Sequence, residues 1–175
     1  METITTQQKV SRLQTNSTTK TFFILTLLFA FPFFFGGPQL LIGSIVNLLL
    51  IFIALHYKNH YAIIPMIMLP SIAACVNGLI FGPFTIFLVY MMPAIWIGNL
   101  IFVYTIQHTK IQRLGIFLWW IFKAAFLFLV AYILVHLWIL SVVFIKAMWI
   151  SQIITAMIAA TLGTFILQYT KQKHS

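Results

Sequence analysis

Acidic residues are almost absent from this chain of 175 amino acids, because Glu2 is its only carboxylate side chain. Chemistry that needs paired carboxylates, a serine–histidine–aspartate triad or two bridged metal ions therefore has no residues to use. Cysteine is nearly absent too, since Cys75 stands alone. A lone cysteine excludes an internal disulfide and removes cysteine-based zinc sites and iron–sulfur clusters. We expect a protein that is not an enzyme and that holds no metal and no cofactor.

Charge of either sign is scarce as well. Charged residues make up 6% of the chain, whereas apolar and aromatic residues make up 62%. A soluble domain keeps roughly a quarter of its residues charged, so this composition predicts an integral membrane protein. The net charge of +9 would suggest a nucleic-acid partner in a soluble protein. Here the basic residues lie in tails and short loops, which favours the anionic headgroups of a lipid bilayer and no nucleic acid.

Long apolar runs dominate what is present. A spanning helix needs about 20 mostly apolar residues, with about 17 as a lower limit. The stretches that qualify are Thr21–Gly37, Gln39–His56, Tyr61–Phe81, Pro83–Gln107, Leu114–Leu140 and Met148–Gln168. Glycine and proline mark the turns after the first and third stretches. The end of the fifth is open, because Ser141–Ile145 is still apolar, and the alternative is one long tilted helix.

Lysine and arginine alternate between the two ends of these stretches, and positive charge favours the cytoplasmic side. The other side receives Lys146 alone, and Lys123 falls inside a span. The basic residues of the cytoplasmic side would be Lys9, Arg12, Lys20, Lys58, Lys110, Arg113, Lys171 and Lys173. We therefore expect an all-α, six-helix transmembrane bundle over residues 21–168 with both termini in the cytoplasm. Residues 1–20 would be a polar tail without regular structure, and residues 169–175 a basic tail.

A lysine inside a span is the strongest functional signal, because an ionisable group in lipid marks a functional site by default. Lys123 stands nine residues into the fifth stretch, near the bilayer midplane at about 1.5 Å per residue. No span contains a carboxylate, so Lys123 must be neutral, bonded to amides, or paired with an anion that a ligand brings. The alternative is that its long stem carries the ammonium to the inner interface.

Amide side chains accompany Lys123 at compatible depths. A single amide in a span most often serves helix–helix hydrogen bonding. Four amides in the outer half of three spans, with Lys123 below them, instead predict a pocket open to the outside for a small polar or anionic solute. Outside this group, Trp96 lies in mid-span beside Pro93, and Asn99 lies deeper. The predicted solute-binding residues are Lys123, Asn47, Gln39, Asn77, Gln152, Trp96 and Asn99.

Several of these residues stand in segments that resemble a family of small six-span bacterial membrane proteins. The segments are Pro38–Leu50, Leu69–Ala74 with Asn77-Gly78, Met92–Asn99, Lys123, and Ser151–Ala156. In size and span number, the family is similar to the substrate-binding (S) components of energy-coupling factor transporters, which capture vitamins and other micronutrients. The resemblance covers residues 22–168 and implies a compact six-helix bundle with its ligand site near the outer surface. It also implies a coupling transmembrane subunit and cytoplasmic ATPases as partners.

The expected function is therefore that of a substrate-binding subunit of a micronutrient uptake transporter in the bacterial cytoplasmic membrane. The solute would be vitamin-like or a small polar or anionic molecule. The chain has no Walker motif and no intramembrane carboxylate for proton relay, so partner subunits would supply the energy. The alternative is a membrane scaffold or assembly protein whose amides only hold helices together. An intramembrane enzyme is a third reading, which the absence of acids and of a nucleophile–base pair disfavours.

Overall fold

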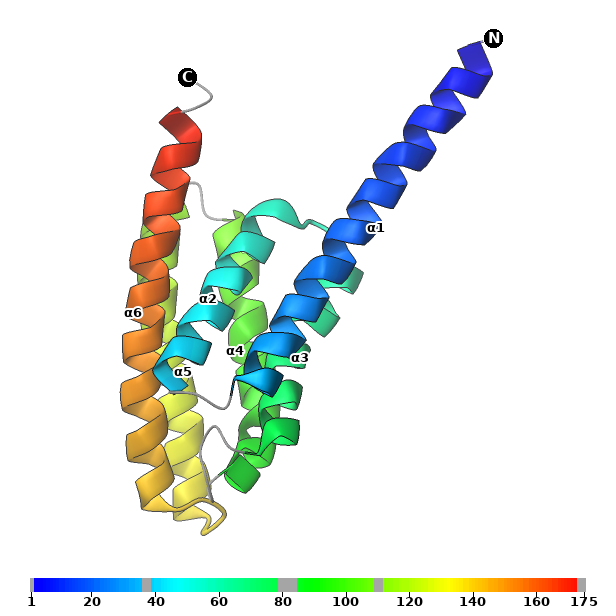
Figure 1. The fold of residues 1–175 in the computed structure, drawn as a ribbon. Helices are drawn as coiled ribbons and strands as arrows, with labels where there is room; N and C mark the ends of the chain where they lie inside the picture. Colours follow the sequence, from blue (N-terminus) through cyan, green and yellow to red (C-terminus); the bar gives the residue numbers. More distant parts are fainter. Residues whose placement is uncertain (1, 36–38, 79–84, 109–111, 173–175) are drawn as a thin grey trace.

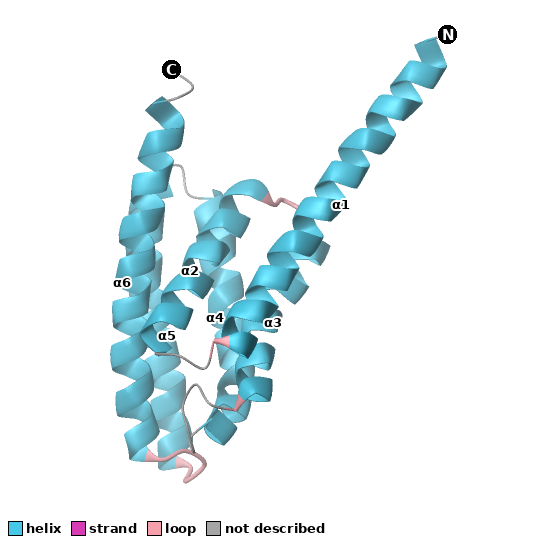
Figure 2. Ribbon diagram, in the orientation of Figure 1, coloured by secondary structure: helices cyan, strands magenta, loops and turns pink. Residues whose placement is uncertain are grey.

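The computed structural model describes residues 2–35, 39–78, 85–108 and 112–172, and within these ranges the chain is all-helical (Figure 1). The expectation of an all-α protein is thereby confirmed. The connections at residues 57–59 and 137–141 are short loops (Figure 2). The helices are α1 (Glu2–Phe34), α2 (Gln39–His56), α3 (His60–Asn77), α4 (Thr85–His108), α5 (Gln112–His136) and α6 (Val142–Gln172).

The helices run up and down in one bundle (Figure 1). The most extensive contacts join α2 to α6 and α1 to α3, and α5 packs against both α4 and α6. The N-terminal end of α1, the loop after α2 and the C-terminal end of α6 lie at one end of the bundle, and the α5–α6 turn lies at the opposite end.

The second apolar stretch coincides with α2 from Gln39 to His56, as the sequence predicts. The third ends at Asn77 rather than at Phe81, because Gly78 adopts a left-handed conformation (φ 72°) and its N–H bonds to Ala74 O. Residues 79–84 lie outside the described residues. At the other end of α3, the side chain of Asn59 accepts a hydrogen bond from the N–H of Tyr61 and caps the helix.

The fifth apolar stretch ends earlier in the structure than the sequence predicts, and the sixth begins earlier. The alternative that the fifth stretch continues as one long tilted helix is wrong. α5 ends at His136, and α6 already begins at Val142. Trp138 has a φ of 60° and donates its N–H to Val135 O, while Ile139 donates to Leu134 O. These two bonds form a Schellman motif, which closes the last turn of α5. Its usual glycine is replaced here by tryptophan.

The polar N-terminal segment is helical, whereas the sequence predicts no regular structure there. α1 begins at Glu2 and continues through residues 2–20 into the apolar stretch. This part of α1 projects beyond the rest of the bundle (Figure 1). Residues 1–20 contain neither glycine nor proline, so nothing in the sequence interrupts a helix that the apolar part has already nucleated.

Three of the helices, α2, α3 and α4, are long and apolar enough to cross a membrane. The apolar parts of the other helices for which side chains are described are shorter, namely Thr18–Phe34, Trp120–His136 and Trp149–Phe165. Large apolar side chains are also exposed around the bundle, for example Phe52 on α2, Ile97 on α4 and Phe122 on α5. A bundle that is apolar outside as well as inside has the character of a helical membrane protein.

The two halves of the bundle are packed differently. The half that contains the loop after α2 holds a buried apolar cluster from α1, α2, α3, α4 and α6, which includes Leu50, Met66 and Ile106. There Gly163 lets α6 approach Ile51 of α2 closely, because an added Cβ would lie 2.8 Å from Ile51 Cδ1. In the other half, Gly43 of α2 lies equally close to Thr155 of α6. These small residues keep α2 and α6 in contact along their length.

Replacing Gly43 by alanine tests the second of these contacts. The new Cβ would lie 2.8 Å from Thr155 Cγ2, so Thr155 or the helix must move. We expect the free energy of unfolding to fall by about 1–3 kcal/mol, as in overpacked cores. Gly98→Ala is the matched control, because its nearest neighbour, Lys123 Cγ, would be 3.6 Å away. That substitution should leave stability unchanged or raise it by about 0.5–1 kcal/mol. Unfolding in detergent micelles measures both, and an equal response would contradict the contact.

Candidate functional site

A cavity of about 100 Å³ lies in the second half of the bundle. Its walls come from the last turn of α1, the first half of α2, the second half of α3, the first two thirds of α4, and the middle of α5 and α6. The half of the bundle that contains the α5–α6 turn holds this cavity and, between α4 and α5, a smaller apolar cluster around Met91, Leu127 and Ala131. We call it the hollow half, and the half that holds the larger apolar cluster the packed half. The polar residues that line the cavity are Gln39, Asn47, Ser71, Asn99, Lys123, Gln152 and Thr155.

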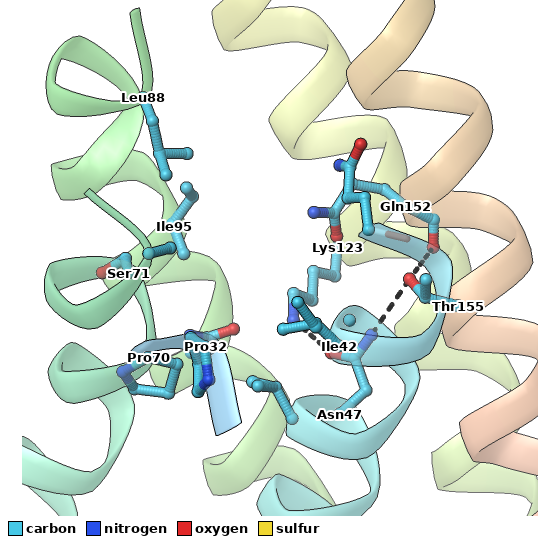
Figure 3. Close-up of a pocket in the computed structure, with 15 residues that line it drawn as sticks. Pro32, Ile42, Asn47, Pro70, Ser71, Leu88, Ile95, Lys123, Gln152 and Thr155 are labelled. Atoms are coloured by element: carbon cyan, nitrogen blue, oxygen red, sulfur yellow. Dashed lines mark hydrogen bonds between the residues drawn. The ribbon is translucent and has the colours of Figure 1, made fainter. Parts of the chain in front are cut away.

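The cavity has two unlike sides (Figure 3). On one side stand the polar groups of α2, α5 and α6, with Lys123 reaching into the space from α5. Facing them are the largely apolar side chains of α1, α3 and α4, among them Pro70, Leu88 and Ile95. A molecule in this space would meet this polar side and, facing it, mostly hydrocarbon with the polar groups of Ser71 and Asn99, which is the usual character of a small-molecule site.

A chain of hydrogen bonds organises the polar side (Figure 3). Lys123 Nζ donates to Asn47 Oδ1 at 2.9 Å, and Asn47 Nδ2 donates to Thr155 Oγ1 at 3.4 Å. The Thr155 hydroxyl in turn donates to the carbonyl of Gln152 at 3.2 Å. One amide, Asn47, thereby joins α5 to α6 through α2 and holds both of its neighbours in place.

Lys123 is buried among these groups, with 9% of its surface exposed. Its ammonium lies 5.5 Å from the centre of the Phe102 ring, and Phe102 belongs to the apolar cluster of the packed half. The lysine thus stands at the boundary between the packed half and the hollow half. The alternative that it snorkels to an interface does not describe this position. Its amide partner matches the expectation for a lysine in a chain without intramembrane carboxylates.

Asn99 lines the same cavity from α4 and has an incomplete set of hydrogen bonds. Its Nδ2 donates to the carbonyl of Ile67 on α3 at 3.1 Å. Its Oδ1 is buried and has no hydrogen-bond partner among the described residues. The bond to Ile67 fixes the orientation of the amide, because the reverse orientation would place two carbonyl oxygens together. A buried acceptor without a donor is costly, so Asn99 Oδ1 is suited to a donor from a bound molecule.

Two of the predicted site residues lie elsewhere. Asn77 and Trp96 do not line this cavity, whereas the other predicted residues do. Asn77 donates to the carbonyl of Phe33 and ties α3 to α1. Trp96 donates its indole N–H to Ser71 Oγ at 2.7 Å. It therefore holds the side chain of Ser71, which lines the cavity, without lining the cavity itself. Both side chains hold helices together, which is the commoner role of a polar group in a span.

The structure adds residues that the sequence did not single out for the site. Thr155 and Ser71 line the cavity, and Gly43 lines it where α2 meets α6. The one available signal for Thr155 was its spacing, because it stands three residues after Gln152 and so shares a helix face with it. Ser71 directly follows Pro70, and its spacing did not relate it to any of the predicted site residues.

A second, small pocket of about 10 Å³ lies behind the lysine. Lys123 and Asn47 line both spaces, so they form a partition between them. Trp120 lines the small pocket, and its indole N–H has no hydrogen-bond partner among the described residues. The volume is that of about one water molecule, which suits a site where a single water accepts from Trp120.

In chemical terms, the cavity offers binding groups, namely an ammonium, amide donors and an unmet amide acceptor. Within the part of the chain that the structure describes, no three histidine, cysteine or acidic side chains come together to hold a metal ion. Comparisons with protein-family models, curated proteins and solved structures give no match.

A double-mutant cycle tests the bond between Lys123 and Asn47. Asn47→Leu alone leaves a buried ammonium without its amide, and we expect a loss of about 1–3 kcal/mol in the free energy of unfolding. Combined with Lys123→Met, it should cost less than the sum of the two single changes, by about 0.5–3 kcal/mol. Gln107→Leu is the control partner, because Gln107 bonds to Tyr57 O at the other end of the bundle. Asn47→Leu and Gln107→Leu should add, and additivity of the first pair would contradict the bond.

Proposed function

We propose that the chain is the substrate-binding membrane subunit of an uptake transporter in the bacterial cytoplasmic membrane. The observation that carries this proposal is a buried lysine beside a cavity in a protein with no intramembrane carboxylate. A lysine in lipid is costly and is retained where it serves a function. Its only side-chain hydrogen bond in the described residues is to Asn47, so an incoming solute is the natural source of a counter-charge.

The proposal includes six spans with both termini in the cytoplasm. Positive charge supports this orientation, because Lys58 lies in the loop after α2, at the end of the bundle opposite the α5–α6 turn. The cavity then lies in the outer half of the membrane, which suits a protein that captures a solute from outside.

Cysteine labelling tests the orientation. In a Cys75→Ala background, Leu137→Cys and Lys58→Cys place a thiol at exposed positions of the α5–α6 turn and of the loop after α2. A membrane-impermeant maleimide added to intact cells should label the Leu137→Cys protein and not the Lys58→Cys protein. After permeabilisation both should react, which controls for accessibility. The opposite pattern would reverse the orientation, and labelling of both in intact cells would contradict the span number.

Energy for transport would come from other subunits. The chain lacks a Walker motif for ATP hydrolysis, and no acidic residue follows Glu2 to relay protons within the membrane. The proposed partners are accordingly a coupling transmembrane subunit and cytoplasmic ATPases. The exposed apolar faces of α2, α4 and α5 could meet either lipid or such a subunit, because both are apolar.

The volume of the cavity favours the smaller of the expected solutes. At about 100 Å³ it is smaller than the ~150 Å³ engineered cavity that holds benzene in another protein. Benzene has six non-hydrogen atoms, so about six is an upper limit for a molecule in this space, by the same comparison. The structure thus supports a small polar or anionic solute better than a vitamin-sized one.

Co-purification tests the binding function. Native mass spectrometry of the protein purified from its own host should show one small molecule per chain, which is then identified after denaturation. Lys123→Met should abolish its retention, because the ammonium that holds it is gone. Lys58→Met, which removes an exposed lysine from a loop, should retain it. Equal retention by both variants would contradict a role for Lys123 in binding.

The second candidate is a membrane scaffold, and a specific set of contacts favours it. Asn77, Asn99 and Gln107 each donate a hydrogen bond to a backbone carbonyl of another segment. Such amides stabilise a bundle without any ligand. A protein that purifies without a solute but together with other membrane subunits would favour the scaffold over the binding subunit.

A further inference from the structure

The polar groups of the cavity also define the chemistry of the molecule that fits it. We infer that the solute is a small hydroxy acid, in which a carboxylate binds Lys123 and a neighbouring hydroxyl donates to Asn99. This inference rests on the proposed binding function and gives its substrate class. Three features of the cavity lead to it, namely its unbalanced lysine, its unmet acceptor and its size.

The first feature is that Lys123 has no negatively charged partner within the protein. An ammonium carries three N–H donors, and among the described residues Asn47 Oδ1 accepts from one of them. The amide is neutral, and the chain has no carboxylate beyond Glu2 at the far end of α1. The protein thus supplies a hydrogen-bond acceptor but no countercharge. A carboxylate can accept from the remaining N–H groups and balance the charge, with charge-assisted bonds about twice as strong as neutral ones.

The second feature is that the side-chain oxygen of Asn99 lacks a hydrogen-bond donor. Asn99 Oδ1 is buried and unpartnered among the described residues, on a side chain with 3% of its surface exposed. Its Nδ2 is held by Ile67 O, so the amide cannot turn to offer its own donor. A carboxylate oxygen accepts and cannot satisfy this atom. The solute therefore needs an N–H or O–H group in addition to its acid.

Charge and size decide which donor this is. An ammonium group on the solute would place a second positive charge in a cavity whose lysine already lacks a countercharge, whereas a hydroxyl adds none. The cavity of about 100 Å³ is suited to at most about six non-hydrogen atoms, and glycolate has five and lactate six. Ile42, Leu88 and Ile95 line the space with hydrocarbon, which suits a short carbon chain.

Calorimetric titration of the full chain in phosphatidylcholine nanodiscs tests the inference. These discs contain no lipid with a net negative charge, so a lipid cannot supply the anion. The probes are lactate and glycolate, with propionate lacking the hydroxyl and lactamide lacking the charge. We expect a hydroxy acid to bind at least about tenfold more tightly than propionate and lactamide, because each analogue leaves one buried group unpaired.

Variants assign each preference to its residue. Lys123→Met should remove the preference for lactate over lactamide, and Asn99→Leu the preference for lactate over propionate. Gln107→Leu removes an amide of the same kind outside the cavity and should keep both preferences. The comparison of probes on the unaltered protein needs no variant, so it decides the matter even where Asn99→Leu fails to fold.

The outcomes separate this inference from the proposed function. Equal binding of lactate, propionate and lactamide would overturn the hydroxy acid, and so would the absence of binding by both hydroxy acids. In either case, a different solute that co-purifies and is lost in Lys123→Met would leave the binding subunit standing. If no probe binds and no solute is retained from the host, both the inference and the proposed function fail.

Discussion

The hydrogen bond from Lys123 to Asn47 is the interaction on which the rest of the site depends. An ammonium surrounded by apolar helices needs a partner, and this sequence offers no acid to provide one. The partner is an amide, which has a second hydrogen-bonding end that reaches Thr155 on α6. A carboxylate in the place of Asn47 would balance the charge of Lys123 but could not donate to the threonine. The amide therefore links three helices and supplies no negative charge to the lysine.

This link is possible because α2 and α6 approach each other closely. Gly43 removes the side chain that would otherwise separate Asn47 from Thr155, and Gly163 has the same effect in the packed half. The apolar cluster around Leu50 and Met66 then provides a rigid base, on which Phe102 supports the ammonium. A lysine placed at the boundary of a close-packed region cannot withdraw into it, so its charged end is directed to the space beside it.

The sequence predicted the helices and the group of polar residues better than it predicted where the helices end. Apolar length located α2 from its first residue to its last. Depth alone grouped Lys123 with Asn47, Gln39 and Gln152, which line a common cavity, whereas Asn99 was expected deeper and lines the cavity as well. The end of α5 was not predictable, because Trp138 occupies a left-handed position where glycine is the usual signal. Thr155 was missed because a hydroxyl in a span usually bonds only to its own helix, as Thr26 does to Phe22 O. Asn77 was placed wrongly because depth does not specify which face of a helix a residue occupies.

The same bond has a consequence for any anion that enters the cavity. Asn47 Oδ1 and a solute carboxylate both accept from the Lys123 ammonium, and the charged acceptor makes the stronger bond. Lys123 and Asn47 also separate the cavity from the small pocket beside Trp120. A carboxylate can accept from the two N–H groups that Asn47 leaves free, so the bond to Asn47 need not break when an anion binds. Under the proposed function, Asn47 holds the ammonium in place, and the polar side of the cavity is formed before the solute arrives. Binding then requires no rearrangement of the link between α2, α5 and α6.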